Sequence, residues 1–174
     1  MLTDLSSIDT LRTHVRGVLT RNPGWASALS GFEAESAWMV GAWHDIQRLA
    51  EDTSLQSPPI VMARLLLAMR SGDYSSISAA LSATRTFLGT AITASGVKGY
   101  RRCYNAVLDL HLTQELELIH AAISRLPNHS QARVQKERLQ ELSQTLSARL
   151  DATLPTFRIR EPVLSMRRTA FTLL

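Results

Sequence analysis

Apolar residues recur at spacings of three and four along most of the chain, and this spacing predicts amphipathic α-helices. The first helix begins at Ile8, behind Ser7, and ends before Asn22-Pro23-Gly24, because serine favours a helix start and proline with glycine favours a stop. The same periodicity predicts further helices over residues 32–40, 43–51, 58–71, 77–92, 100–126, 131–151 and 161–174. No segment alternates as a strand would, so the sequence predicts an all-α protein.

The two longest predicted helices differ in how much apolar surface they carry. The helix over residues 100–126 has a broad apolar face, which predicts that Val107, Leu116 and Ile119 point inward. The helix over residues 131–151 is mainly polar and has a narrower stripe. That stripe consists of Val134, Leu139, Leu142, Leu146 and Leu150.

Two interhelix turns share a pattern that indicates a repeat. Gly41-Ala42-Trp43 and Gly72-Asp73-Tyr74 both place a glycine two residues before an aromatic side chain, 31 positions apart. In tetratricopeptide repeats, with a period of about 34 residues, glycine lets antiparallel helices approach and the aromatic ring fills the space between them. The pattern favours tetratricopeptide-like stacked helical hairpins, an α-solenoid fragment, over a closed four-helix bundle.

Composition agrees with one globular domain. The chain has 174 residues, of which 45% are hydrophobic and 20% charged, so it can bury a core without metal or disulfide support. Its single cysteine, Cys103, cannot form an internal disulfide, which favours an intracellular protein. The first ten residues do not resemble a signal peptide, and Arg64 interrupts the most apolar stretch, so no membrane segment is predicted.

The charge pattern argues against direct nucleic-acid binding. The formal net charge is +4, but basic and acidic residues are interspersed. The only tight basic pairs are Arg101-Arg102 and Arg167-Arg168, whereas a nucleic-acid surface clusters its basic groups to neutralise several phosphates together. Solvated charges on helix faces explain the pattern.

The best enzyme-like cluster lies in the longest predicted helix. His111, Glu115, Glu117 and His120 fall within ten residues, and Glu117 with His120 forms the Glu-x-x-His spacing of di-metal helical proteins. Such a site needs a second copy of the motif, which the sequence lacks. Phosphate-loop, nucleophile-elbow and kinase motifs are also missing, so we expect no catalytic, cofactor or metal residue. A helical metalloenzyme stays an alternative that needs further ligands facing His120.

Four segments, in the same order, resemble motifs of the FAT domain of phosphatidylinositol 3-kinase-related protein kinases. They are Phe32–Trp38 followed by Trp43-His44-Asp45; Leu65–Ala68 followed by Gly72-Asp73; Tyr100–Tyr104 followed by Leu110-His111-Leu112 and Glu115-Leu116-Glu117; and Arg160–Leu164 followed by Arg167-Arg168. The last segment is most similar to the ATR-type DNA-damage checkpoint branch. The resemblance covers roughly residues 20–174, and the helix before it matches no motif.

The resemblance implies that the motif residues make contacts between helices. These residues are Trp38, Trp43, Tyr100, Arg102, Tyr104, His111, Glu115, Glu117, Glu161, Pro162, Arg167 and Arg168. His111, Glu115 and Glu117 become polar contacts, with Arg101, Arg102, Arg167 and Arg168 as candidate partners. On this reading, Glu117→Ala is expected to destabilise the fold.

The family further implies a function for the whole protein. We expect a non-catalytic scaffold segment of a nuclear serine/threonine kinase, which uses ATP and magnesium and acts in DNA-damage and replication-stress signalling. The kinase domain is absent from residues 1–174, and the apolar Leu173-Leu174 end suggests a fragment. Expected partners are the kinase domain, neighbouring helices and a regulatory subunit, with no nucleic acid or membrane. The alternative is a free-standing tetratricopeptide-like adaptor that binds a protein partner.

The family's preference for Ser-Gln and Thr-Gln sites draws attention to three dipeptides of the chain itself. They are Thr113-Gln114, Ser130-Gln131 and Ser143-Gln144. Serine and threonine are so frequent here that chance produces such pairs, and the motif carries little weight.

Overall fold

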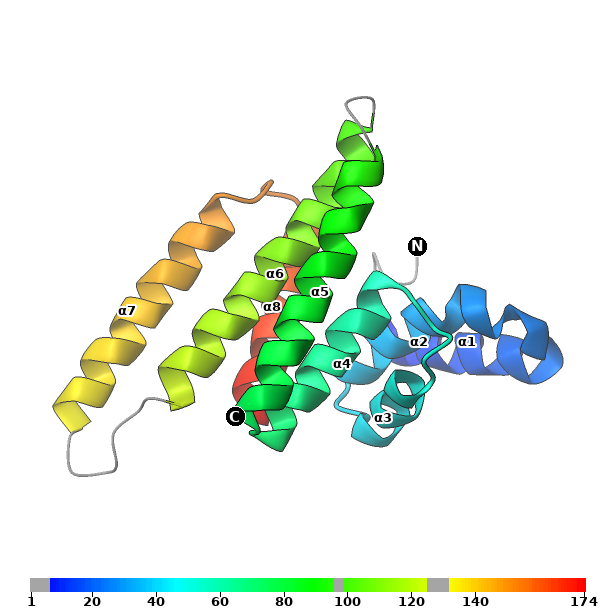
Figure 1. The fold of residues 1–174 in the computed structure, drawn as a ribbon, viewed down its shortest axis with the longest axis horizontal. Coiled ribbons are helices and arrows are strands. Elements are labelled where there is room, and N and C mark those ends of the chain that lie inside the picture. Colours follow the sequence, from blue (N-terminus) through cyan, green and yellow to red (C-terminus); the bar gives the residue numbers. More distant parts are fainter. Residues whose placement is uncertain (1–6, 96–98, 125–131) are drawn as a thin grey trace. The chain divides into compact units, whose positions relative to one another are not determined.

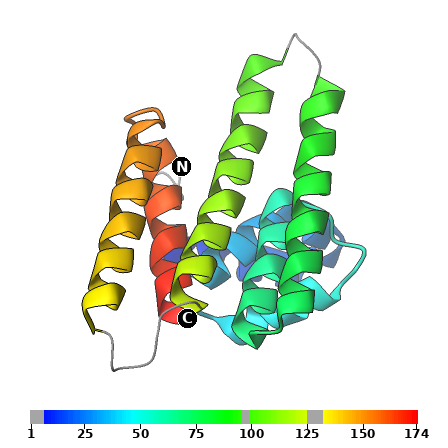
Figure 2. The same ribbon diagram turned by 60° about the vertical axis from the view of Figure 1, so that its left-hand side comes forward.

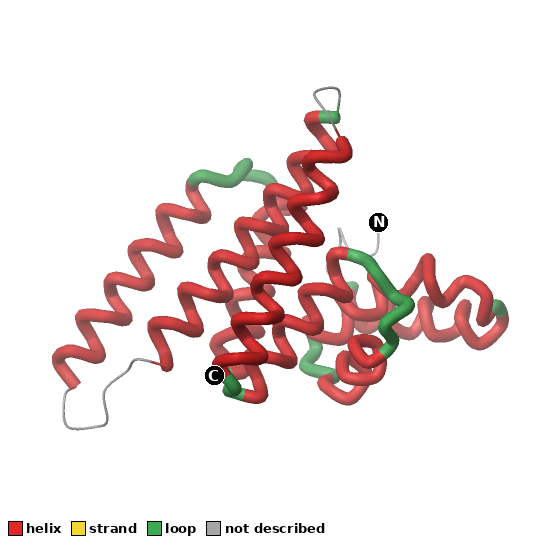
Figure 3. The backbone as a smooth tube through the Cα atoms, viewed as in Figure 1, coloured by secondary structure: helices red, strands yellow, loops and turns green. Residues whose placement is uncertain are grey.

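A computed structural model describes residues 7–95, 99–124 and 132–174 of the chain (Figure 1). Its elements are α1 (Ile8–Arg21), the 3-10 turn η1 (Pro23–Trp25), α2 (Ala26–Met39), α3 (Trp43–Glu51), α4 (Pro58–Ser71), α5 (Tyr74–Ser95), α6 (Tyr100–Ser124), α7 (Ala132–Asp151) and α8 (Phe157–Leu173). No strand occurs within these ranges (Figure 3), which confirms the predicted all-α fold.

The chain divides into two compact units, residues 1–110 and residues 111–174, so the boundary lies within α6. In the first unit α4 is the central helix, because it contacts α2, α3 and α5. Apolar residues occupy most of its circumference, as expected for a helix surrounded by others, and Arg64 interrupts them. Its buried residues are Ile60, Val61, Met62, Ala63, Leu65, Leu66 and Met69.

Glycine turns join consecutive helices of the first unit, as the repeat pattern predicts. Gly41 and Gly72 both have φ of +70°, a left-handed conformation that costs glycine little. The aromatic residues behave differently. Trp43 is half-buried, with the Arg70 guanidinium 5.2 Å from its ring centroid, but Tyr74 is 80% exposed. The expectation that both rings fill interhelix space is therefore wrong for Tyr74.

In the second unit, α7 and α8 both lie against the C-terminal part of α6 (Figure 2). Leu142 and Leu146 of α7 are buried and Leu150 is half-buried, but Val134 and Leu139 are exposed, so only part of the predicted stripe faces the core. Val107 of α6, in the first unit, is likewise exposed rather than inward. Within the described helices, none has the length and apolar composition needed to cross a bilayer.

Some helices begin earlier than their apolar periodicity indicates. Helix α2 begins at Ala26 rather than Phe32, because its first turns contain mostly small residues that are compatible with a helix but produce no apolar stripe. Helix α8 begins at Phe157 rather than at Glu161, since the backbone N–H groups of Ile159 and Arg160 already donate to the Thr156 carbonyl. Pro162, predicted at the helix start, therefore lies inside the helix.

Pro162→Ala is expected to raise the free energy of unfolding by about 1–3 kcal/mol, because proline cannot donate the helical hydrogen bond to the carbonyl four residues earlier. Urea denaturation of the two proteins measures the difference. Pro59→Ala is the matched control, since Pro59 lies in the first turn of α4, where the missing N–H has no helical acceptor. A loss of stability in Pro162→Ala would show that the proline ring makes a packing contact larger than the lost hydrogen bond.

Candidate functional site: a buried carboxylate shared by three helices

Glu115 is the most buried charged side chain described in the second unit, at 1% exposed. It lies on the side of α6 that also carries Leu112, Leu116 and Ile119, all buried. An isolated carboxylate in such an apolar environment is strongly destabilising unless it is paired and hydrogen-bonded. Because α6 places Glu115 on its buried side, the Glu115 carboxylate needs partners that compensate its charge.

Arg167 of α8 supplies the main partner. Its Nε donates to Glu115 Oε2 at 2.7 Å and its Nη2 donates to Oε1 at 2.7 Å, a two-point contact that fixes both planar groups. The same Nη2 also donates to the carbonyl of Leu146 in α7 at 2.7 Å. One guanidinium thus joins α6, α7 and α8.

Two further groups complete the network. The Nη2 of Arg149 donates to the carbonyl of His111 at 3.0 Å, and its Nε lies 3.5 Å from Glu115 Oε1. His111 Nε2 lies 3.0 Å from the same carboxylate oxygen. Burial, followed by the charge of Arg149, lowers the pKa of His111, although Glu115 acts in the opposite direction. The imidazole is therefore neutral at pH 7, and because a carboxylate only accepts, its Nε2 carries the proton.

The geometry gives the network a structural rather than a catalytic capacity. The Glu115 oxygens already face two guanidinium groups and one imidazole, and the residue is only 1% exposed, so the carboxylate is engaged in ion pairing rather than presented to a substrate. In the part of the chain that the structure describes, no group of three or more His, Cys, Asp or Glu residues could hold a metal ion. The buried ion pairs and hydrogen bonds of Glu115 fix the three helices to one another.

The other motif residues lie in varied environments. Glu117 is half-buried and accepts a hydrogen bond at 2.9 Å from Gln114 Nε2, on the same helix, so we expect alanine substitution to cost more at Glu115 than at Glu117. Glu161 accepts one at 2.8 Å from Ser165 Oγ, and Arg168 is exposed.

The remaining motif residues belong to the first unit. Tyr104 and Trp43 are half-buried and Trp38 is buried. The side chains of Tyr100, Arg101 and Arg102 lie outside the described residues.

Of the three Ser-Gln and Thr-Gln dipeptides, only Ser143-Gln144 is exposed in the described residues. Thr113 is fully buried, which prevents a kinase from reaching it in the folded chain. Ser130 lies outside the described residues.

The first unit contains an ion cluster that the sequence analysis did not single out. The carboxylate of Asp45 in α3 accepts hydrogen bonds from Arg12 and Arg16, one turn apart on α1. Although burial acts in the opposite direction, the Arg12 hydrogen bond and the Arg16 charge lower the pKa of Asp45. Arg48 pairs with buried Glu33 at 2.6 Å. The four-residue spacing of Arg12 and Arg16 indicates that both lie on one face of α1, but nothing in the sequence identifies Asp45 as their partner.

Asp109 is a second group of the first unit that the sequence analysis missed. Burial, and secondarily the charge of Glu35 on α2, raises the pKa of this α6 carboxyl to about 7. A carboxyl with a raised folded-state pKa stabilises the fold in its protonated form, so this contribution is lost as the pH rises through about 7.

Asp109→Asn is therefore expected to gain stability relative to the parent chain as the pH rises from about 4 to about 7, so that the difference between the two proteins changes by about 1–3 kcal/mol between pH 5 and pH 8. Urea denaturation at both pH values measures it. Asp151→Asn, which removes a carboxylate at an exposed position, is the matched control. The same stability change at both pH values in Asp109→Asn would contradict titration of this group.

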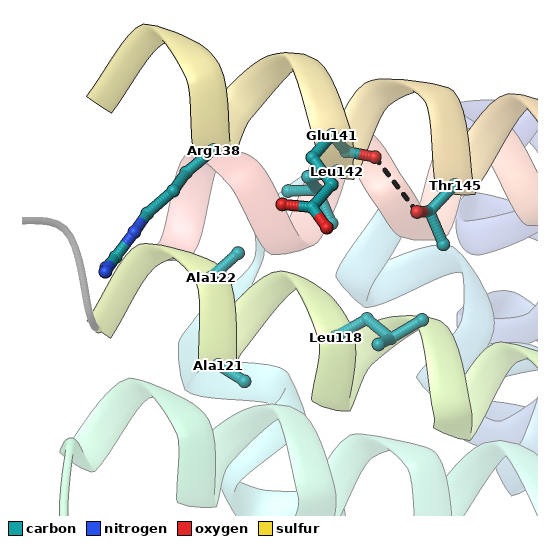
Figure 4. A pocket seen from close by; sticks show the side chains of 7 residues that line it. All are labelled: Leu118, Ala121, Ala122, Arg138, Glu141, Leu142 and Thr145. Atoms are coloured by element: carbon teal, nitrogen blue, oxygen red, sulfur yellow. Dashed lines mark hydrogen bonds between the residues drawn. The ribbon is translucent and has the colours of Figure 1, made fainter. Parts of the chain in front are cut away.

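An open groove lies between α6 and α7 in the second unit (Figure 4). It has a volume of about 360 Å³ and is lined by Leu118, Ala121, Ala122, Arg138, Glu141, Leu142 and Thr145. The floor is apolar, and Arg138 and Glu141 lie at its edge on α7. Thr145 Oγ1 donates to the Glu141 carbonyl at 2.9 Å, so this hydroxyl is already engaged within the helix. The groove can take apolar side chains.

Comparison with known proteins identifies the class. The FAT domain family matches residues 30–174, so the chain belongs to that family and the predicted resemblance is confirmed. The match begins at residue 30 rather than at about residue 20. No solved structure matches the chain.

Among curated proteins, the chain is similar to serine/threonine-protein kinase ATR. It is 25% identical over 174 residues to the ATR of Arabidopsis thaliana, covering 93% of this chain and 6% of that protein. It is also 25% identical over 185 residues to the ATR of Oryza sativa subsp. indica and subsp. japonica, covering 99% of this chain and 7% of each. The chain thus spans only a small part of the length of these relatives.

Proposed function

We propose that this chain is a non-catalytic scaffold segment of an ATR-like serine/threonine kinase. The observation that carries the proposal is the FAT family match over residues 30–174. The Glu115 network supports it, because three helices fixed by a buried two-point ion pair form a rigid element suited to mechanical support.

In the proposed whole protein, the residues of this chain form a rigid support and take no part in phosphoryl transfer. ATP and magnesium are bound by the kinase domain of that protein, and no residue of this chain is assigned to them. The chain contacts the kinase domain, neighbouring helices and a regulatory subunit. The proposed setting is nuclear signalling in response to DNA damage and stalled replication, and the proposed substrates carry Ser-Gln or Thr-Gln sites.

The proposal is tested by comparing the isolated chain with the native protein. Antibodies raised against the 174-residue chain recover the native protein from cells, and both preparations are incubated with ATP, magnesium and a Ser-Gln peptide. We expect phosphorylation by the recovered protein and none by the isolated chain, with an Ala-Gln peptide as the control substrate. Recovery of a protein of 19.3 kDa without kinase activity would contradict the proposal.

One observation favours a second candidate, a peptide-binding adaptor. The α6–α7 groove has an apolar floor and charged edges, as grooves that accept an amphipathic helix do. The antibody experiment separates the two candidates, since an adaptor is recovered without kinase activity of its own.

A further inference from the structure

The segment that joins α3 to α4, residues 52–57, is held by one side chain of α4 (Figure 1). Arg64 is half-buried, and its Nε donates to the carbonyl of Ala50 at 3.0 Å. Its Nη2 donates to the carbonyls of Asp52 at 2.9 Å and of Leu55 at 3.0 Å. One guanidinium therefore binds the last turn of α3 and two points of the segment that follows. We call residues 52–57 the α3–α4 strap.

The three acceptors of Arg64 are backbone carbonyls, which carry no net charge. The Ala50 carbonyl belongs to the last turn of α3, where carbonyls lack helical partners and the helix dipole favours a cation. The carboxylate of Asp52 is engaged with Ser54, from which it accepts the backbone N–H at 3.0 Å and the hydroxyl at 2.6 Å. Arg64 thus acts as a C-terminal cap of α3 that is supplied by another helix.

The α3–α4 strap has few contacts of its own. Leu55 is its only fully buried side chain, at 8% exposed, whereas residues 52–54 and Gln56 are exposed. The backbone N–H of Leu55 donates to the Asp52 carbonyl at 3.2 Å, the same oxygen that Arg64 binds. The closed position of the strap therefore depends mainly on Leu55 and on Arg64.

The far end of the strap opposes closure. Ser57 Oγ is buried, and among the residues that the structure describes it has no hydrogen-bond partner. Ser57 is the N-cap of α4, yet its side chain makes no cap hydrogen bond. Helix α2 comes close at this point, because a Cβ on Gly31 would lie only 3.4 Å from Ser57 Oγ. A buried hydroxyl without a partner is destabilising, and opening of the strap returns it to water.

We infer that the α3–α4 strap is a conformational switch of the first unit, held closed by the Arg64 guanidinium, and that it opens while the surrounding helices stay folded. Segments with few buried apolar contacts open at a lower free energy than the whole domain. Opening releases Leu55 from the core and removes the cap from α3. This inference is independent of the kinase assignment, because it concerns contacts within residues 50–64 and the neighbouring Gly31.

Amide hydrogen exchange of the chain, followed residue by residue by NMR at low urea concentrations, tests whether the strap opens locally. We expect the amides of Ser54 and Leu55 to exchange at rates that depend little on urea. The amides of Leu65 and Leu66, buried in α4, should depend on it strongly, because local opening exposes much less surface than global unfolding. Equal urea dependence in the two sets would overturn the proposal, since the strap would then open only when the unit unfolds.

A pair of arginine variants tests the role of Arg64. Arg64→Met keeps a long side chain that is compatible with a helix but removes every donor, so the Ser54 and Leu55 amides should exchange at least about tenfold faster. Arg70→Met is the matched control on the same helix, because the Arg70 guanidinium lies over Trp43 rather than at the strap. Unchanged exchange at Ser54 and Leu55 in Arg64→Met would overturn the proposal.

Ser57→Ala should act in the opposite direction. It removes the unpaired buried hydroxyl, so the closed strap gains stability and the Ser54 and Leu55 amides should exchange more slowly than in the parent chain. Circular dichroism checks that all variants fold. Exchange that is unchanged or faster in Ser57→Ala would contradict the opposition that we assign to this hydroxyl.

Discussion

Replacing Glu115 with alanine is expected to lower the free energy of unfolding by about 3–5 kcal/mol. The substitution removes the carboxylate that Arg167 holds at two points, and it leaves the guanidinium groups of Arg167 and Arg149, 12% and 25% exposed, without this carboxylate beside them. Breaking one side of a buried pair costs far more than the pair itself contributes, because the remaining charge has lost its solvation. Urea denaturation followed by circular dichroism measures the change.

The matched control is Glu137→Ala. Glu137 pairs with Arg133 one turn earlier on α7 at 3.0 Å, but the two side chains are 59% and 89% exposed. An exposed pair of this kind contributes about 0–1 kcal/mol, so its loss should be barely measurable. If Glu115→Ala and Glu137→Ala had equal effects, the Glu115 network would not be the element that fixes the three helices.

Trp38→Ala is expected to cost about 3–5 kcal/mol, the range for removing a large aromatic ring from a packed core. Trp38 is 6% exposed and lies on α2, where Ala34 and Ala37 are also buried, so the neighbouring small side chains cannot fill the space that it leaves. Denaturation monitored by circular dichroism is the measurement, since it does not depend on the tryptophan that is removed.

The other two tryptophans provide a graded control. Trp43 is half-buried beside Arg70, so Trp43→Ala should cost about 1–2 kcal/mol. Trp25 is 58% exposed, and Trp25→Ala should stay within about 0.5 kcal/mol. A different order among the three variants would contradict the placement of the motif tryptophans.

The helical architecture could be predicted because it depends on local periodicity. Apolar residues at spacings of three and four located all eight α-helices of the described ranges, and Gly41 and Gly72 marked two turns by their conformational freedom. Helix starts were less accurate where the first turns lack an apolar stripe, as in α2. The spacing of apolar residues indicates which face of a helix is buried. A first turn of small or polar residues has no such spacing, so the start of the helix is missed.

The candidate site could be predicted only in part. The family resemblance placed Glu115, Glu117 and His111 among four candidate arginines, including Arg167. It could not choose Glu115 over Glu117, because that choice depends on which side of α6 faces α8. The sequence does not indicate Arg149, since its contact with the His111 carbonyl depends on how α7 lies against α6.

The cluster around Asp45 could not be predicted for a similar reason. Its hydrogen bonds join residues 33 and 29 positions apart, and such pairs are defined by tertiary packing rather than by sequence spacing. The raised pKa of Asp109 likewise depends on burial and on Glu35, which lies far away in the sequence.

We propose that this chain supports a kinase through helices fixed by Glu115. The most direct test introduces Glu115→Ala and Glu137→Ala separately into the native protein in its cells and measures Ser-Gln peptide phosphorylation per amount of recovered protein. We expect Glu115→Ala to lose most of the kinase activity, while Glu137→Ala keeps the activity of the parent protein. Full activity in Glu115→Ala, at normal abundance, would contradict the claim.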